Sequence, residues 1–137
     1  MKSILSLAIA LVALFSVNTA VAQNPHFVEN TPCFSGSNLS VHIAGLGNNQ
    51  LITITVTGTA ICEQKNNPNR ENQVVNDFNS KFTVRSDKNG NVNLDETIRT
   101  CPGGFTGSIQ TATVCVFEGR KASGEPLIAC TEATACR

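Results

Sequence analysis

The alternation in residues 51–62, LITITVTGTAIC, is the feature that most constrains how this chain can fold. Side chains project to opposite faces along a β-strand, so residues two positions apart share a face. Apolar side chains occupy one face and threonines the other: Ile52, Ile54, Val56, Ala60 and Cys62 against Thr53, Thr55, Thr57 and Thr59. We predict one long strand whose apolar face is turned to the core and which the rest of the chain pairs with or covers.

Shorter segments of similar character surround this strand. They are residues 26–28, 39–43, 81–85, 91–98, 108–118 and 126–129. Asn-Gly at 89–90 is a strong turn signal because both residue types tolerate positive φ, so we interpret residues 81–98 as a β-hairpin. About seven short strands separated by turns, with no helical pattern, predict an all-β fold. The specific prediction is a small, disulfide-stabilised, Ig-like β-sandwich.

The first 22 residues have the pattern of a secretory signal peptide. Lys2 is followed by an apolar stretch at residues 4–15 and by the small-x-small sequence Ala20-Val21-Ala22. The apolar stretch is shorter than the roughly 20 residues that a membrane span needs, which argues against a retained anchor. We therefore expect a secreted protein whose single domain is residues 23–137, with no membrane anchor in the mature chain.

All six cysteines lie in the predicted mature chain: Cys33, Cys62, Cys101, Cys115, Cys130 and Cys136. An even number in a small exported protein predicts a framework of three disulfides. Zinc is the weaker interpretation because the chain has no CxxC spacing and only two histidines. The pairing stays open: Cys62 could meet Cys101 or Cys115, and Cys130 with Cys136 could close a terminal loop.

Charge and aromatic content restrict the partners. Ten basic residues balance ten acidic ones and form no cluster, so the chain lacks the positive field that nucleic acids and anionic membranes require. Trp and Tyr, on which protein-binding hot spots depend, are absent. Recognition would rest on Asn, Ser, Thr and backbone groups. We expect an extracellular protein or glycan as partner, and a monomeric chain.

No stretch supplies the groups of a catalytic or metal site. His26 and His42 stand apart, and no serine lies in a GxSxG sequence. Asp95 and Glu96 are adjacent in a predicted strand and therefore point to opposite faces. Disulfide-bonded cysteines are not nucleophiles. We expect no enzymatic activity, no catalytic residues, no cofactor and no metal.

Residues 63–80, EQKNNPNRENQVVNDFNS, form the one long stretch that we interpret as irregular. Asn and Pro favour turns, and a loop of this length in a compact domain is either a solvated connection or a functional element. Val74, Val75 and Phe78 are expected to pin its end to the core. Together with the loop at 119–124, it supplies the candidate binding residues: Asn66, Asn67, Asn69, Arg70, Arg120 and Lys121.

Three short stretches resemble small exported Ig-like sandwiches, the neocarzinostatin type among them. They are LSVHIAGLG at 39–47, TGTAIC at 57–62 and the turn at 86–92. The resemblance is one of topology, and it implies no ligand and no site residue for this chain.

Three functions remain as hypotheses. The first is a secreted, disulfide-rich binding module that uses loops at one end of the sandwich. The second is a secreted protease inhibitor or host-directed effector, presenting Arg120-Lys121 or residues 99–102 to a protease. The third is a structural component of a cell surface or matrix. Separately, Asn38 lies in the sequence Asn-Leu-Ser, a candidate for N-glycosylation in a eukaryotic host.

Overall fold

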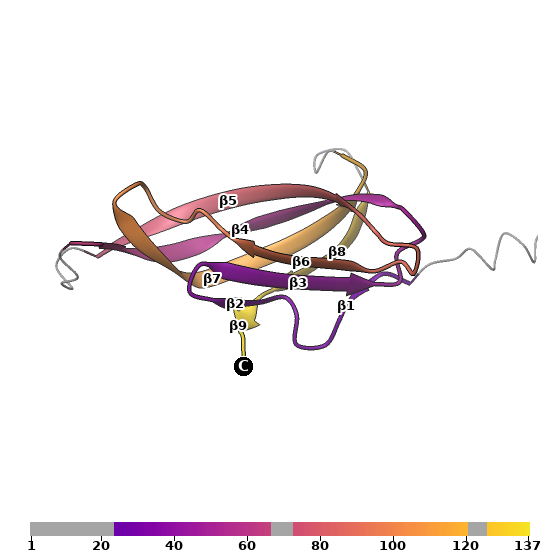
Figure 1. Cartoon of the computed structure of the whole chain (residues 1–137), viewed down its shortest axis with the longest axis horizontal. Coiled ribbons are helices and arrows are strands. Elements are labelled where there is room, and N and C mark those ends of the chain that lie inside the picture. The colour runs from indigo at the N-terminus through magenta and orange to yellow at the C-terminus, as the bar shows by residue number, and fades with distance from the viewer. Residues whose placement is uncertain (1–23, 67–72, 121–125) are drawn as a thin grey trace, which may run out of the picture.

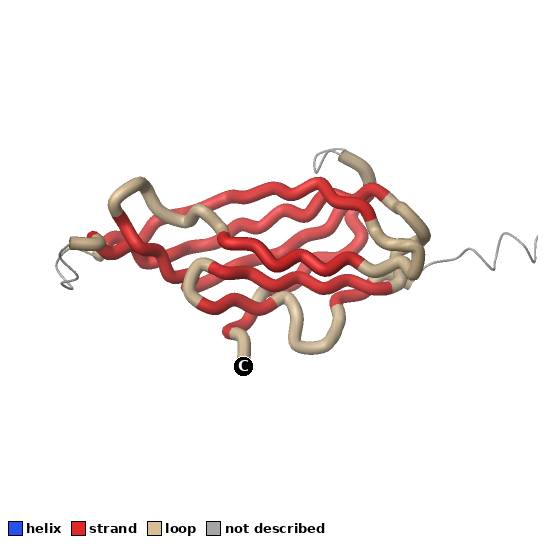
Figure 2. Tube along the Cα trace, viewed as in Figure 1, coloured by secondary structure: helices blue, strands red, loops and turns tan. Residues whose placement is uncertain are grey.

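The computed structural model describes residues 24–66, 73–120 and 126–137, and two β-sheets account for most of them (Figures 1 and 2). The first sheet contains β1 (His26–Phe27), β2 (Cys33–Ser35), β3 (Asn38–Ala44), β6 (Val92–Thr97) and β9 (Thr134–Ala135). The second contains β4 (Leu51–Gln64), β5 (Val74–Arg85), β7 (Phe105–Glu118) and β8 (Leu127–Glu132). None of the described segments forms a helix that is long and apolar enough to cross a membrane.

The predicted all-β sandwich is therefore confirmed, and the described residues form nine strands in place of about seven. The two additional strands are β2 and β9, of three and two residues, which are too short for any alternation to reveal them. They pair with each other in parallel and so add β9 to the edge of the first sheet.

Strand order places the longest strands at the centre of the second sheet. The order there is β5-β4-β7-β8, and every neighbouring pair is antiparallel. In the first sheet β3 is central. Ile43 pairs with β6 on one side and with β1 on the other, and β2 follows β1 along the same edge of β3.

The core lies between the two sheets and is built mainly from the inward faces of β3, β4 and β7, with Val92 and Leu94 from β6 and Phe78 from β5. All five apolar residues predicted to face inward from 51–62 are buried. The opposite, threonine-bearing face is more open, with one exception. Thr53 is also fully buried, and its hydroxyl donates to the carbonyl oxygen of Gly119 at 2.7 Å.

A β-bulge in β7 changes which residues face the core. Thr59 pairs with Thr111, but the next residue, Ala60, pairs with Ile109, so Gln110 has no partner on β4. The extra residue moves Ile109 to the inner face, where it is 2% exposed. Simple alternation along residues 108–118 would place Ile109 on the opposite face from Val114, so alternation alone assigns Ile109 to the wrong face.

The predicted hairpin at 81–98 is wrong. β5 pairs with β4 in the second sheet, whereas β6 pairs with β3 in the first, so residues 86–91 cross between the sheets. The turn itself is present, with Gly90 at φ 79° and the Asp87 carboxylate accepting the N–H groups of Asn89 and Asn91. A turn signal predicts a change of direction and says nothing about which strand becomes the neighbour.

The irregular segment predicted at 63–80 is also wrong at both of its ends, while its middle, 67–72, lies outside the described residues. β4 continues to Gln64 and β5 begins at Val74, so both ends of the segment belong to one antiparallel ladder. Phe78 is buried as expected, but Val74 and Val75 are 55% and 69% exposed and do not pin the chain to the core. Strand pairing at a sheet edge is made by the backbone, and a polar composition does not prevent it.

The predicted framework of three disulfides is confirmed, and no cysteine is free. The bonds are Cys33–Cys136, Cys62–Cys101 and Cys115–Cys130. Cys62 therefore meets Cys101, one of its two expected partners. The suggested terminal loop between Cys130 and Cys136 is wrong, because β8 places Cys130 directly opposite Cys115 while β9 carries the end of the chain to β2.

Candidate functional site

The structure describes two of the six residues predicted to contact a partner, Asn66 and Arg120, and both are exposed. Asn66 follows the end of β4, and Arg120 follows the end of β7. Because these strands are antiparallel, the two residues lie at opposite ends of the second sheet and cannot contribute to one small contact surface. The other four lie outside the described residues: Asn67, Asn69, Arg70 and Lys121.

The candidate glycosylation residue Asn38 is the first residue of β3 and is exposed. Its side-chain oxygen accepts a hydrogen bond from the Thr97 hydroxyl at 2.7 Å. That bond leaves the amide nitrogen, the atom to which a glycan would be attached, available. The assignment remains a prediction.

Residues 99–102, suggested as a protease-binding loop, do not present a cleavable bond well. Cys101 is bonded to Cys62, and Thr100 is only 3% exposed. The carbonyl oxygen of Thr100 accepts a hydrogen bond from the Asn76 side chain at 2.7 Å. A basic residue at 99 is therefore followed by a buried residue that is tied to β5, which does not favour the inhibitor hypothesis.

Three groups of catalytic type meet on the outer face of the first sheet. Ser40 and His42 lie two residues apart on β3, and Asp95 lies on the neighbouring strand β6. The His42 Nε2 to Asp95 Oδ2 distance is 3.4 Å. The carboxylate stands between the other two groups, so the histidine cannot act as base toward the serine in the manner of a catalytic triad.

The electrostatics of this cluster are those of a solvated surface. A hydrogen bond from Ser40, with a smaller contribution from His42, holds the pKa of Asp95 below its ordinary value. The Asp95 side chain is 62% exposed, so solvent screens the interaction. The arrangement explains a local preference for the ionised carboxylate and provides no activated nucleophile.

We expect Asp95→Asn to lower the free energy of unfolding by no more than about 0.5 kcal/mol at pH 7. A lowered folded-state pKa stabilises the protein above the unfolded-state pKa of about 4, and this contribution is lost as the pH falls through the folded-state value. Urea unfolding of both proteins at pH 7 and near pH 3 measures it. A loss of several kcal/mol at pH 7 would contradict the assignment of Asp95 to a screened surface pair.

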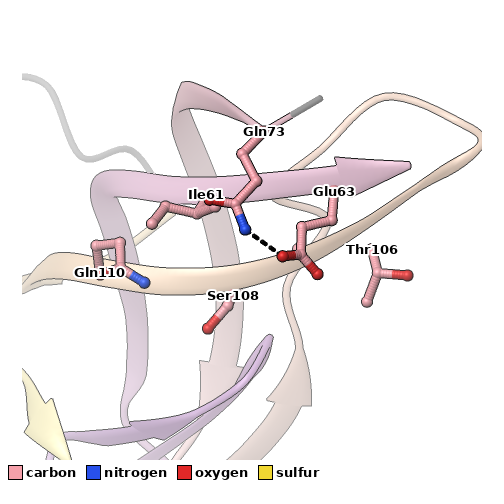
Figure 3. A pocket seen from close by; sticks show the side chains of 7 residues that line it. Ile61, Glu63, Gln73, Thr106, Ser108 and Gln110 are labelled. Carbon is pink, nitrogen blue, oxygen red and sulfur yellow. Dashed lines mark hydrogen bonds between the residues drawn. The ribbon is translucent and has the colours of Figure 1, made fainter. Parts of the chain in front are cut away.

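A hollow of about 230 Å³ lies beside the bulge on the outer face of the second sheet (Figure 3). Glu63 points toward Gln73, whose amide donates a hydrogen bond to its carboxylate. The lining residues are Ile61, Glu63, Gln73, Thr106, Gly107, Ser108 and Gln110. Glu63 is the one ionisable group among these described residues, so they supply no second acid or base for a hydrolytic site. In the described parts of the chain, no cluster of three metal-ligating side chains is present either.

Among the strands that the structure describes, the longest edge without a neighbouring strand is the outer edge of β5, at the rim of the second sheet (Figure 1). This strand has 12 residues, contains no Pro or Gly, and pairs with β4 without a register shift. The other rim strands that we compare with it are protected. β6 has six residues and carries Asp95 and Glu96, and β8 has six residues and follows Pro126. Short length, charged side chains and proline are the usual features that keep an edge strand from pairing with another chain. Of these features, β5 has only a few charged side chains.

Hydrogen bonds at the strand ends show which backbone groups of β5 face outward. Ser86 donates to Gln50 at 2.9 Å, and Gly119 donates to Leu51 at 3.0 Å. Bonding alternates along an antiparallel pair, so even-numbered residues of β4 bond to β5 and odd-numbered ones to β7. The odd-numbered residues 75–83 of β5 therefore point their N–H and C=O groups away from the sheet. In the described ranges, none of these groups has a hydrogen-bond partner outside the β4–β5 ladder.

The side chains along this edge are open as well. Val75, Asp77, Asn79, Lys81 and Thr83 share the outer face of β5, and all are exposed. A continuous strip of exposed side chains thus lies next to a continuous row of unpaired backbone groups.

Sequence reasoning missed this edge because residues 73–80 were interpreted as a loop. A usable signal was present. Phe78, Phe82 and Val84 fall on one parity and extend the alternation of residues 81–85 toward the N-terminus of the segment. No family model matches this chain, and no curated protein is similar enough to count as a match.

Proposed function

We propose that this chain is an exported, disulfide-stabilised binding module of the Ig-like type that holds its partner by β-strand addition along β5. The unpaired, 12-residue edge of β5 is the observation that carries the proposal. In strand addition, main-chain hydrogen bonds provide affinity and alternate side chains provide specificity.

The strand order supports the Ig-like part of the proposal. If β1 and β2 count as one interrupted strand, and β8 and β9 as another, the chain has seven principal strands. The first, second and fifth share one sheet. The third, fourth and sixth form the other together with the β8 part of the seventh, in the order β5-β4-β7-β8, while β9 joins the first sheet. Ig-like domains distribute their strands between two sheets in this way, with the added fourth strand beside the third.

Composition supports the binding mode. The chain has neither Trp nor Tyr, so it supplies none of the Trp or Tyr anchors that dominate many interfaces. Backbone pairing needs no such anchors. The predicted signal peptide and the three disulfides support export, where a stable framework is needed and disulfides persist.

Asn79→Pro tests the proposal. Proline removes an N–H donor that points away from β4 and places its ring on the open edge, so the internal ladder is kept. We expect capture of secreted and surface proteins by the exported, oxidised full chain to fall about tenfold or more. Quantitative mass spectrometry of the captured proteins measures the change.

Asn93→Pro is the matched control. Ile98 donates to Ser37 at 2.8 Å, so odd-numbered residues of β6, Asn93 included, also point their backbone groups outward. The same substitution is thus made at an exposed asparagine on the rim of the other sheet. Binding that survives Asn79→Pro but not Asn93→Pro would place the site on the first sheet and contradict the proposal.

A further inference from the structure

We infer that the partner of the β5 edge is a second copy of this chain, paired antiparallel about a twofold axis at Asn79. The inference rests on the proposed function, because it names the occupant of the same edge. It departs from the monomer expected from the sequence, where residues 73–80 were not yet recognised as a strand.

Symmetry limits the possible registers. Two antiparallel copies of one strand are related by an axis perpendicular to the sheet, and directly opposed residues point to the same face. The axis must therefore place one residue of β5 opposite the same residue of the partner. Registers in which residues of opposite parity face each other are excluded.

Charge selects among the remaining registers. An axis at Asp77 or at Lys81 places like charges directly opposite each other, which is destabilising. An axis at Phe78 places Asn79 opposite the partner's Asp77, and an axis at Ser80 places Asn79 opposite the partner's Lys81. In either register neither the Asp77 carboxylate nor the Lys81 ammonium faces an opposite charge across the interface. An axis at Asn79 places Asp77 opposite the partner's Lys81, and symmetry repeats that pair on the other side.

Backbone geometry and exposure agree with this centre. Asn79 is an odd-numbered residue whose N–H and C=O face outward, so the two copies of Asn79 exchange both bonds. The same register sets Val75 opposite the partner's Thr83 and Val74 opposite the partner's Val84. The two valines that are 55% and 69% exposed in the single chain each gain a β-branched neighbour.

A charge exchange tests the inference. Asp77→Lys and Lys81→Asp each convert both symmetric pairs from opposite to like charge, and we expect each to weaken dimerisation by about tenfold or more. Mixing the two variants restores both pairs in a heterodimer: the introduced Lys faces the introduced Asp, and the native Lys81 faces the native Asp77. Sedimentation equilibrium of the exported, oxidised full chain from micromolar to millimolar concentration measures each association constant.

Both residues are exposed, so at a protein concentration low enough to keep every chain monomeric the variants should unfold at the wild-type denaturant midpoint, which serves as the control for folding. A dimer that is weakened by each substitution and recovered to near wild-type affinity in the mixture supports the inference. A dimer that neither charge variant weakens, or that the mixture fails to recover, overturns the Asn79-centred register.

The wild-type association state separates this inference from the proposed function. A wild-type chain that stays monomeric at every concentration overturns the second copy as occupant. The proposed function is then judged independently, because capture of a different protein that is lost in Asn79→Pro and kept in Asn93→Pro would still place a partner on β5.

Discussion

Replacing Cys33 and Cys136 together with alanine is expected to lower the free energy of unfolding by about 4 to 5 kcal/mol. The bond joins residues separated by 103 positions, so its removal releases the unfolded chain from a loop that spans nearly the whole domain. Cys136 is exposed and Cys33 is half-buried, so the substitution opens no core cavity. Guanidinium unfolding of the exported protein measures the loss, which is a large part of the 5 to 15 kcal/mol typical of a domain.

Cys115→Ala with Cys130→Ala is the matched control. This bond also lies outside the core, between directly opposed residues of β7 and β8, but it closes a separation of only 15 residues. The chain-entropy relation gives about 3 kcal/mol for it. If the short loop proved to be worth more than the long one, restriction of the unfolded chain would not be the main source of stabilisation.

Local alternation was sufficient to predict the central strand and its core residues. Which face of residues 51–62 is buried depends only on the side-chain period, and the buried residues Ile52, Ile54 and Val56 follow it. The same rule failed at Ile109, because the bulge at Gln110 inserts one residue and reverses the parity of everything before it. A bulge depends on the fit between two strands and leaves little trace in one of them.

Strand partners and edges could not be predicted in this way. The sequence around Asn89-Gly90 has the turn of a hairpin, yet the buried faces of β5 and β6 belong to different sheets. Nothing in residues 81–98 distinguishes a return to the same sheet from a crossing to the other. The disulfide Cys33–Cys136 was unpredictable for the same reason, since it follows from the pairing of two very short strands, β2 and β9.

The candidate site was missed because the sequence of a strand does not show whether the strand lies at the edge of its sheet. An edge is defined by the absence of a neighbour, and the side chains of β5 do not encode that absence. Asp77 and Asn79 look like loop residues in the sequence, and Lys81 begins the predicted strand at 81–85. The three become a candidate interaction surface only because the backbone beside them is unpaired. The expectation that a chain without Trp or Tyr relies on polar side chains and backbone groups stays a prediction, and the proposed site agrees with it.

The second large effect is expected at the close contact between β4 and β7. Gly58 faces the core opposite Ala112, one residue before the point where the register shifts. A β-carbon at Gly58 would overlap the carbonyl oxygen of Thr111 and lie 2.9 Å from the Cα of Ala112, both of which are backbone atoms of the central sheet. Because backbone in a paired strand cannot move aside as a flexible side chain can, we expect Gly58→Ala to lower the free energy of unfolding by about 3 kcal/mol.

Gly103→Ala is the control, because a β-carbon there meets no atom within 4 Å and its φ is not in the left-handed region. We expect that substitution to change stability by less than about 0.5 kcal/mol. Equal and small effects at both positions would show that β7 can shift away from β4, and that the bulge is not held firmly. A large effect confined to Gly58 would show that the backbone contact is rigid. The bulge, which turns Ile109 into the core and borders the hollow at Glu63, would then be a constrained feature of the second sheet. β5 belongs to the same sheet through its pairing with β4.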